Sequence, residues 1–200
     1  MVSDHEVSSN AELFRQSVSE AILRNIDEIV RRDSAILDKA YARLTTLQAW
    51  RSFVLDQQIS REALGFFAEA QNDGITSSIL ITSGLWRSSL KSLRSLIENL
   101  VQSVYFMDHP VEYRRWADGK LRLTFNELFK YLSEHPDIAN LPDALNPVAD
   151  LKADYSYLSN VVHSSSLQFR MTDDVDELVV PSRMITFPLG DLPCSWQDRC

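Results

Sequence analysis

The stretch LWRSSLKSLRSLIENLVQSVYF, residues 85 to 106, decides the fold class of this chain. Its apolar residues recur every three or four positions, which is the period of an α-helix with one buried face. This apolar stripe consists of Trp86, Leu90, Leu93, Ile97, Leu100 and Val104. A polar stripe runs beside it and consists of Arg87, Lys91, Arg94, Glu98 and Gln102. The stretch therefore predicts a helix with one face in a core and a polar face next to it.

The same period continues in both directions along the chain and predicts six helices, over residues 11–32, 34–57, 59–74, 75–110, 111–136 and 148–163. Ser9 and Glu12 have the spacing of a capping box, which places the start of the first helix. Asn72-Asp73-Gly74 is a typical helix stop and ends the third. Pro110 ends the long fourth helix, and Gly119 is a candidate break within the fifth.

These segments predict an all-α fold, an up-down helical bundle with long N-terminal helices and a short irregular or extended C-terminal tail. We expect residues 1–74 to form a helical extension that packs on a core of residues 75–170. Residues 171–200 would form the tail, where Val179, Val180, Ile185 and Phe187 favour short extended pieces. Glycine is scarce, with five in 200 residues, which favours long helices in the first half.

Composition restricts the class of protein. The net charge of −8 argues against broad, non-specific nucleic-acid binding, because a basic surface supplies most of that affinity. Cys194 and Cys200 both lie in the last seven residues, which is unlike a disulfide scaffold and favours a reducing cytoplasm. The polar N-terminus is unlike a signal peptide, and no apolar run is long enough for a membrane span. We therefore expect a cytoplasmic protein without a membrane segment.

The segment YSYLSNVVHSSS, residues 155 to 166, contains the candidate functional histidine. On a helical wheel, Lys152, Ser156, Ser159 and His163 align as a polar stripe, with Asn160 at its edge. This stripe lies about 90° from the apolar stripe of Leu151, Tyr155, Leu158 and Val162. If the two polar stripes face each other across a cleft, then His163 and Arg94 meet there. Alternatively, His163 only interacts with the helix dipole, and Arg94 and Glu98 form a structural i,i+4 pair.

Taken together, residues 85–106 and 155–166 resemble the HEPN superfamily of all-helical nucleotide-binding domains, over roughly residues 75–170. In particular, they resemble a bacterial branch with an R-x-x-x-E helix and a later Y-x-x-L-S-x-x-x-H helix. The resemblance implies a bundle of four or five helices, often a homodimer. Active members are metal-independent ribonucleases in toxin–antitoxin, phage-defence and RNA-processing systems. Their signature is an arginine, a polar residue after it, and a histidine four to six residues after the arginine.

Within this resemblance His163 matches the family histidine, and Ser159 takes the place of the polar residue. The family arginine belongs at Ser156, Tyr157 or Leu158, and none of these is an arginine. Ribonuclease activity therefore does not follow from the resemblance. Our hypothesis is that Arg94, from the other helix, supplies the missing cation.

Two functions remain open within this resemblance, and a plain helical adaptor unrelated to the superfamily is a third possibility. As a ribonuclease in phage defence or toxin biology, the chain would use His163 as acid or base and Arg94 to grip the phosphate, because imidazole titrates near neutrality and guanidinium binds phosphate in two places. Ser159 and Asn160 would orient the scissile group, and the binding residues would be Glu98, Arg87, Lys91 and Lys152. As a non-catalytic module, the chain would bind a nucleotide, an antitoxin or another protein, or form a homodimer. We expect no metal and no cofactor in either case.

Overall fold

The computed structural model describes the backbone of residues 4–163 and the side chains from Val7 to His163. This part of the chain contains α-helices and two 3-10 turns, at Leu55–Gln57 and Asp143–Leu145, and no strand. The α-helices are α1 (Asp4–Arg32), α2 (Ser34–Phe53), α3 (Arg61–Thr82), α4 (Trp86–Asp108), α5 (Pro110–Ala117), α6 (Phe125–Glu134), α7 (Pro136–Ala139) and α8 (Val148–Val162). The expected all-α fold is confirmed. The expectations for the tail, including Cys194 and Cys200, lie outside the described residues.

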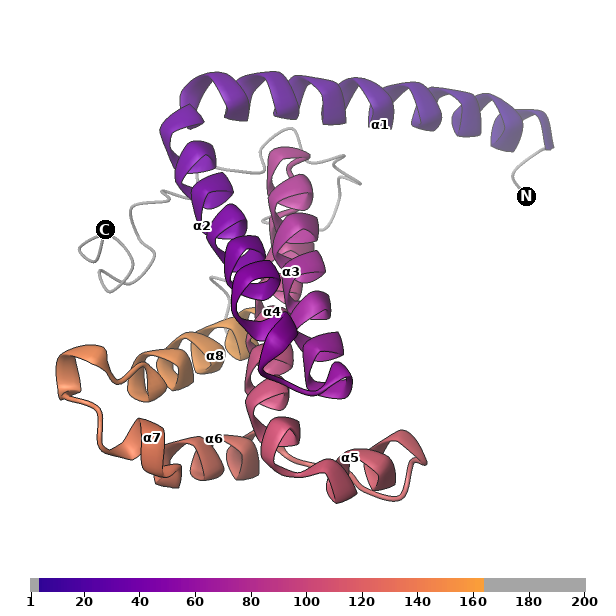
Figure 1. Ribbon diagram of the computed structural model, residues 1–200. Coiled ribbons are helices and arrows are strands. Elements are labelled where there is room, and N and C mark those ends of the chain that lie inside the picture. The colour runs from indigo at the N-terminus through magenta and orange to yellow at the C-terminus, as the bar shows by residue number, and fades with distance from the viewer. Residues whose placement is uncertain (1–3, 164–200) are drawn as a thin grey trace.

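Helices α3 and α4 form an antiparallel pair at the centre of the molecule (Figure 1). Small side chains allow them to approach closely, since Ala63 and Ala70 of α3 are fully buried against α4. Two buried serines of α4 are hydrogen-bonded across the contact: the Ser89 hydroxyl lies 2.8 Å from that of Ser77, and the Ser103 hydroxyl donates to the Ala63 carbonyl at 2.9 Å. Because these buried polar atoms are paired, the contact has little unsatisfied polarity.

The other side of α4 supports the helices of the second half of the chain. The core there combines buried residues of α4, α6 and α8 around Val101, Leu128 and Val161, each almost inaccessible to solvent. The expected stripes of α4 and α8 supply much of it, since Trp86, Leu90, Ile97 and Leu158 are buried. Helix α6 begins with a capping box in which Thr124 and Glu127 bond each other's backbone and side-chain groups.

Two predicted helix boundaries, both in the α3–α4 pair, are wrong. Helix α3 continues through Asn72-Asp73-Gly74 instead of stopping there, because tertiary contacts use these residues within the helix. Asp73 accepts a hydrogen bond from Asn99 at 2.8 Å, and a Cβ on Gly74 would lie 2.6 Å from Leu44 of α2. The break comes instead at Gly84, whose φ of +84° is open to glycine, so the predicted helix over 75–110 is divided between α3 and α4. The expected division between the extension, residues 1–74, and the core, residues 75–170, therefore falls inside helix α3.

The outer helices differ less from expectation. Helix α1 begins at Asp4, so Ser9 lies inside the helix and is not its cap. Helix α2 ends at Phe53, and a 3-10 turn replaces the last part of the predicted second helix. Gly119 has a φ of +70° and does separate α5 from α6, as the sequence indicated. The last described helix, α8, ends at Val162 with His163 as its C-cap residue.

Helix α1 runs across the end of α2 and α3, and its N-terminus points away from the body (Figure 1). Only its second half is fixed to the body: Ala21 and Ile29 are buried, and the Asn25 amide donates to the Ser83 carbonyl at 3.3 Å. From Val7 to Ser17, every side chain of α1 is exposed. The position of the projecting half therefore depends on the joint between Asn25 and the turn at Gly84.

We expect Gly84→Ala to lower the free energy of unfolding by about 1–3 kcal/mol, the cost of holding a non-glycine residue in the left-handed region. The new Cβ would also collide with the Asn25 amide. Gly65→Ala is the matched control, because Gly65 lies within α3 and its Cβ would have open space. The control should be neutral or stabilise by up to about 1 kcal/mol. Urea denaturation measures both, and equal stability of the two variants would contradict the role of Gly84.

Candidate functional site

Arg94, Glu98 and Tyr155 contact one another between α4 and α8, and Arg94 Nε is buried without a hydrogen-bond partner among the described residues. Arg94 Nη2 lies 2.9 Å from Glu98 Oε1, which confirms the expected i,i+4 pair. The Tyr155 hydroxyl accepts a hydrogen bond from Arg94 Nη2 at 2.7 Å and donates to Glu98 Oε1 at 2.9 Å. The Arg94 guanidinium carbon also lies 5.0 Å from the centre of the Tyr155 ring. We call these three residues the clamp.

The clamp is half-buried, with 26% of the Arg94 side chain and 32% of the Glu98 side chain exposed. Phe125 of α6 stacks on the Tyr155 ring at 3.5 Å between ring centres, which fixes the phenol in place. Burial raises the pKa of Tyr155; the hydrogen bond from Arg94 lowers it, and the bond to Glu98 raises it again. The clamp therefore joins three helices, and its two charges are directed at each other and at one phenol.

The remaining residues of the predicted polar stripes do not join the clamp through any described contact. Arg87 lies with its guanidinium 5.7 Å from the Trp86 ring centre, and Lys91 is exposed. Lys152 is also exposed, and its carbonyl accepts the Ser156 hydroxyl at 2.8 Å. Asn160 is exposed, one turn before the end of α8.

Ser159 and His163 follow Tyr155 by one and two turns toward the C-terminal end of α8. His163 is exposed, and its backbone N–H donates to the Ser159 carbonyl at 3.0 Å. Tyr155 precedes His163 by eight residues, which is about 12 Å of helix. Within residues 4–163 no contact links the imidazole to Arg94, so their meeting in one hollow stays a prediction. The Ser159 hydroxyl is buried and has no hydrogen-bond partner in the same part of the chain.

A second polar group, which the sequence reading missed, lies where α4, α6 and α7 meet. Asp108 at the end of α4 accepts a hydrogen bond from the Tyr131 hydroxyl, and His135 Nε2 lies 3.0 Å from the same Asp108 oxygen. Tyr105 and His109 stack beside them at 4.1 Å, and the Tyr131 ring meets both edge-on. No motif relates these residues, because they are separated by up to 30 positions in the chain.

The hydrogen bonds of this group indicate a structural role. His135 Nδ1 accepts the backbone N–H of Asp137 at 3.2 Å, so the ring proton is on Nε2 and points to Asp108. Both imidazole nitrogens are thus engaged, and none is left to accept a proton from a substrate. Burial and the hydrogen bond to Asp108 raise the pKa of Tyr131. The group holds α6 and α7 against the end of α4.

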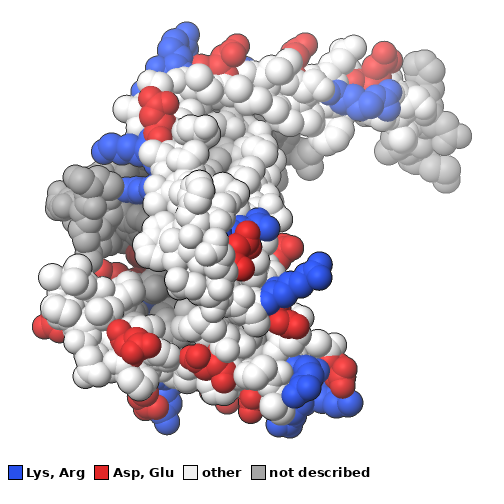
Figure 2. Space-filling model, in the orientation of Figure 1, with Lys and Arg blue, Asp and Glu red and all other residues white. Residues whose placement is uncertain are grey.

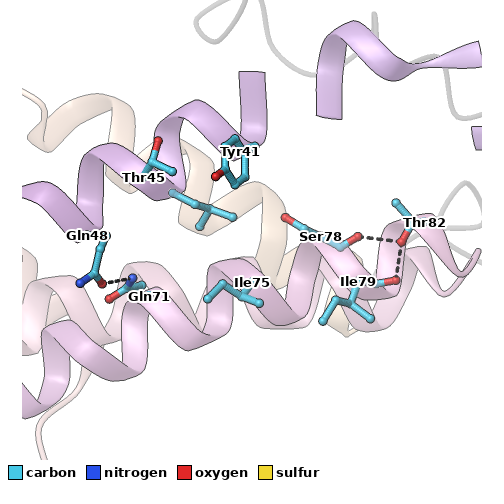
Figure 3. A pocket seen from close by; sticks show the side chains of 9 residues that line it. Tyr41, Thr45, Gln48, Gln71, Ile75, Ser78, Ile79 and Thr82 are labelled. Carbon is cyan, nitrogen blue, oxygen red and sulfur yellow. Dashed lines mark hydrogen bonds between the residues drawn. The ribbon is translucent and has the colours of Figure 1, made fainter. Parts of the chain in front are cut away.

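One uncovered apolar surface lies between α2 and α3. An open groove of about 480 Å³ runs between α2 and α3 (Figure 3). It is lined by Tyr41, Leu44, Thr45, Gln48, Gln71, Ile75, Ser78, Ile79 and Thr82. Gln48 and Gln71 are hydrogen-bonded across it, and Ile79 is 60% exposed. No residue of α2 is buried, so this helix covers α3 only partly.

The projecting half of α1 carries a second uncovered apolar surface. Val7, Ala11, Phe14 and Val18 follow one another at spacings of four, three and four residues, so they share one face. Ala21 and Asn25 continue this face into the part of α1 that is packed on the body. Phe14 is 54% exposed. It lies on the same face of α1 as Ala21, which is buried against the body. We call residues 7–18 the arm.

Tyr155→Phe should lower the free energy of unfolding by about 1–2 kcal/mol, because it removes two hydrogen bonds to charged partners while it keeps the stacked ring. Tyr41→Phe is the control, since Tyr41 is 70% exposed, and we expect its effect to be near zero. Chemical denaturation at neutral pH measures both. Equal stability of Tyr155→Phe and the wild type would show that the clamp contributes nothing to the joint between α4 and α8.

The raised pKa of Tyr131 predicts a loss of stability at alkaline pH. The folded chain holds the phenolic proton more tightly than the unfolded chain, so the stabilisation is complete below about pH 10 and declines as pH rises through the folded pKa. The denaturation midpoint of the wild type should therefore fall as the pH rises above about 10, and that of Tyr131→Phe should fall less. Tyr41→Phe should keep the wild-type slope. Identical slopes in Tyr131→Phe and the wild type would contradict this assignment.

Residues 4–163 contain no group of three acidic, histidine or cysteine side chains arranged to hold a metal ion. In the same residues no helix has the length and apolar character needed to cross a bilayer. Comparison of the chain with protein-family models, with curated proteins and with solved structures gave no match. The function proposed below rests on the clamp, the arm and the groove.

Proposed function

We propose that this chain is a non-catalytic, HEPN-like helical module that acts by binding a protein partner. The observation that carries the proposal is the uncovered apolar surface of the arm and the groove. Exposed apolar surface flanked by polar residues is typical of protein-binding sites. Here it includes aromatic and aliphatic side chains on three consecutive helices, among them Phe14, Tyr41 and Ile79.

The arm gains little from the rest of its own chain. All of its described side chains before Val18 are exposed, and an isolated helical segment of this length is only marginally stable in water. A partner that covers the face of Val7 and Phe14 would supply the missing packing. The arm is therefore better suited to association than to solvent.

The charges of the clamp support a structural role for Arg94. Glu98 Oε1 and the Tyr155 hydroxyl both contact Arg94 Nη2, so a carboxylate already neutralises much of the guanidinium charge that a phosphate would use. Figure 2 shows basic and acidic side chains interspersed on one face, without a continuous basic surface. The net charge of −8 also opposes binding of a polyanion.

One observation favours a second candidate, the metal-independent ribonuclease. His163 is exposed at the end of α8, and one turn earlier the buried Ser159 hydroxyl has no hydrogen-bond partner within residues 4–163. An accessible imidazole beside a hydroxyl suits acid–base chemistry at a 2′-hydroxyl. Under this alternative His163 would carry the reaction.

The two candidates differ in one assay. Wild type and His163→Ala are incubated with total RNA in the presence of EDTA, and the RNA is followed on a denaturing gel. The proposed module predicts that neither protein cleaves RNA above the buffer control. Cleavage by the wild type that is lost in His163→Ala would establish the ribonuclease instead. Ser156→Ala, which alters an exposed residue on the same stripe, controls for a general change in α8.

A further inference from the structure

We propose that the partner is a second copy of this chain, and that two copies exchange arms so that each arm fills the other copy's groove. This inference rests on the proposed function and names the partner of the same surface. The arm is an apolar ridge without a cover, and the groove is an apolar hollow without an occupant among the described residues (Figure 3). One chain thus carries both halves of a contact.

Ridge and groove have matching periods. The arm presents Val7, Ala11, Phe14 and Val18 at spacings of four, three and four. Helix α3 lines the groove with Gln71, Ile75, Ser78 and Thr82 at the same spacings, and α2 lines it with Tyr41, Thr45 and Gln48 at spacings of four and three. Alternation of three and four residues is the pattern by which side chains of one helix insert between those of another.

The lengths also agree. The ends of Val7 to Val18 and of Gln71 to Thr82 lie eleven positions apart in each case, which is about 16 Å of helix. The arm would therefore contact the whole line of α3 residues in the groove. With α2 on the other side, the partner's arm would complete a three-helix packing in which the exposed Phe14 and Ile79 become buried.

Charge favours the same pairing. The sequence of residues 4–20 contains four acidic residues and one basic residue. Helix α2, which forms one wall of the groove, contains three basic residues and one acidic residue. The opposite net charges of these two segments favour their association, while the arm itself is neutral because Glu12 and Arg15 cancel.

The arm of the same chain does not fit the groove in this register. Helices α1 and α2 are joined at Asp33, so closing them into a hairpin would bring each residue opposite one equally distant from Asp33. Tyr41 would then face Asn25, and Gln48 would face Val18. Val7 and Phe14 would lie opposite residues 59 and 52, beyond the lining of the groove. The packing of Asn25 against Ser83 also opposes this closure.

Exchange of arms between two copies gives a closed, two-fold symmetric dimer. If the arm of the first copy enters the groove of the second, a two-fold axis brings the second arm to the first groove, and no arm is left over. The product is a dimer with two equal contacts and no open end.

The oligomeric state of the full chain tests the exchange. Light scattering and sedimentation velocity over a range of concentrations should show a wild-type dimer. Phe14→Lys in the arm and Ile79→Glu in the groove should each raise the dimer dissociation constant about a hundredfold or more, because each places a charge in a packed apolar contact. Leu23→Lys and Leu145→Glu are the matched controls, since they make the same changes at exposed residues outside both surfaces. Both controls should remain dimeric.

Mixing the two variants gives the sharper result. A Phe14→Lys chain keeps an intact groove and an Ile79→Glu chain keeps an intact arm, so the mixture should form a heterodimer with one native contact. A monomeric wild type overturns the exchange. A dimer whose dissociation constant is unchanged by both substitutions also overturns it. A dimer weakened by Phe14→Lys alone overturns it too, because that result indicates that the two arms pair with each other. These outcomes leave the proposed function standing, whereas RNA cleavage that depends on His163 overturns the function whatever the oligomeric state.

Discussion

The close contact between α3 and α4 is the constraint on which the other helices depend. It requires small residues on both sides, and the chain supplies Ala63 and Ala70 against α4 and the paired Ser77 and Ser89 hydroxyls within the contact. Because the two helices approach closely, α4 is left with a second face free to support α6 and α8. Gly74 extends the same requirement to a third helix, since any side chain there would displace Leu44 of α2. One interface of small residues thereby sets the position of both halves of the molecule.

The polar residues of α4 act as fixing points for the helices that follow. Arg94 and Glu98 hold Tyr155 of α8, and Asp108 holds Tyr131 and His135 at the α6–α7 end. Each group combines an aromatic ring that packs with a polar atom that bonds to a charge, so apolar burial and hydrogen bonding act at the same place. These groups resemble catalytic constellations in their residue types. Their hydrogen bonds run mainly between members of the same group, which is the arrangement of a structural joint; within residues 4–163 Arg94 Nε is the exception, since it is buried without a partner.

The helical period predicted the fold class, the stripe of α4, and the Arg94–Glu98 pair, because each depends on residues close together in the chain. It placed helix ends poorly at Asn72-Asp73-Gly74 and at Gly84. A glycine stops a helix or lies within one according to what packs on it, and only the neighbouring helices decide that. Tyr155 was assigned to the apolar stripe, since its ring does pack against Phe125, but the sequence could not show that its hydroxyl bridges Arg94 and Glu98. The Asp108 group joins residues from three helices, and no local pattern marks it.

The two faces of the α3–α4 pair differ in how completely they are covered. On one side, α6 and α8 pack on α4 and bury Leu128 and Val161 almost entirely, so this side forms a complete apolar core. On the other side, α2 buries none of its residues and α1 leaves the core face of its own first half in solvent. Apolar side chains at coiled-coil spacing gain free energy only when another helix covers them. Since the arm and the groove each lack that cover and agree in period and length, the association of two copies satisfies both surfaces with residues already present in one chain.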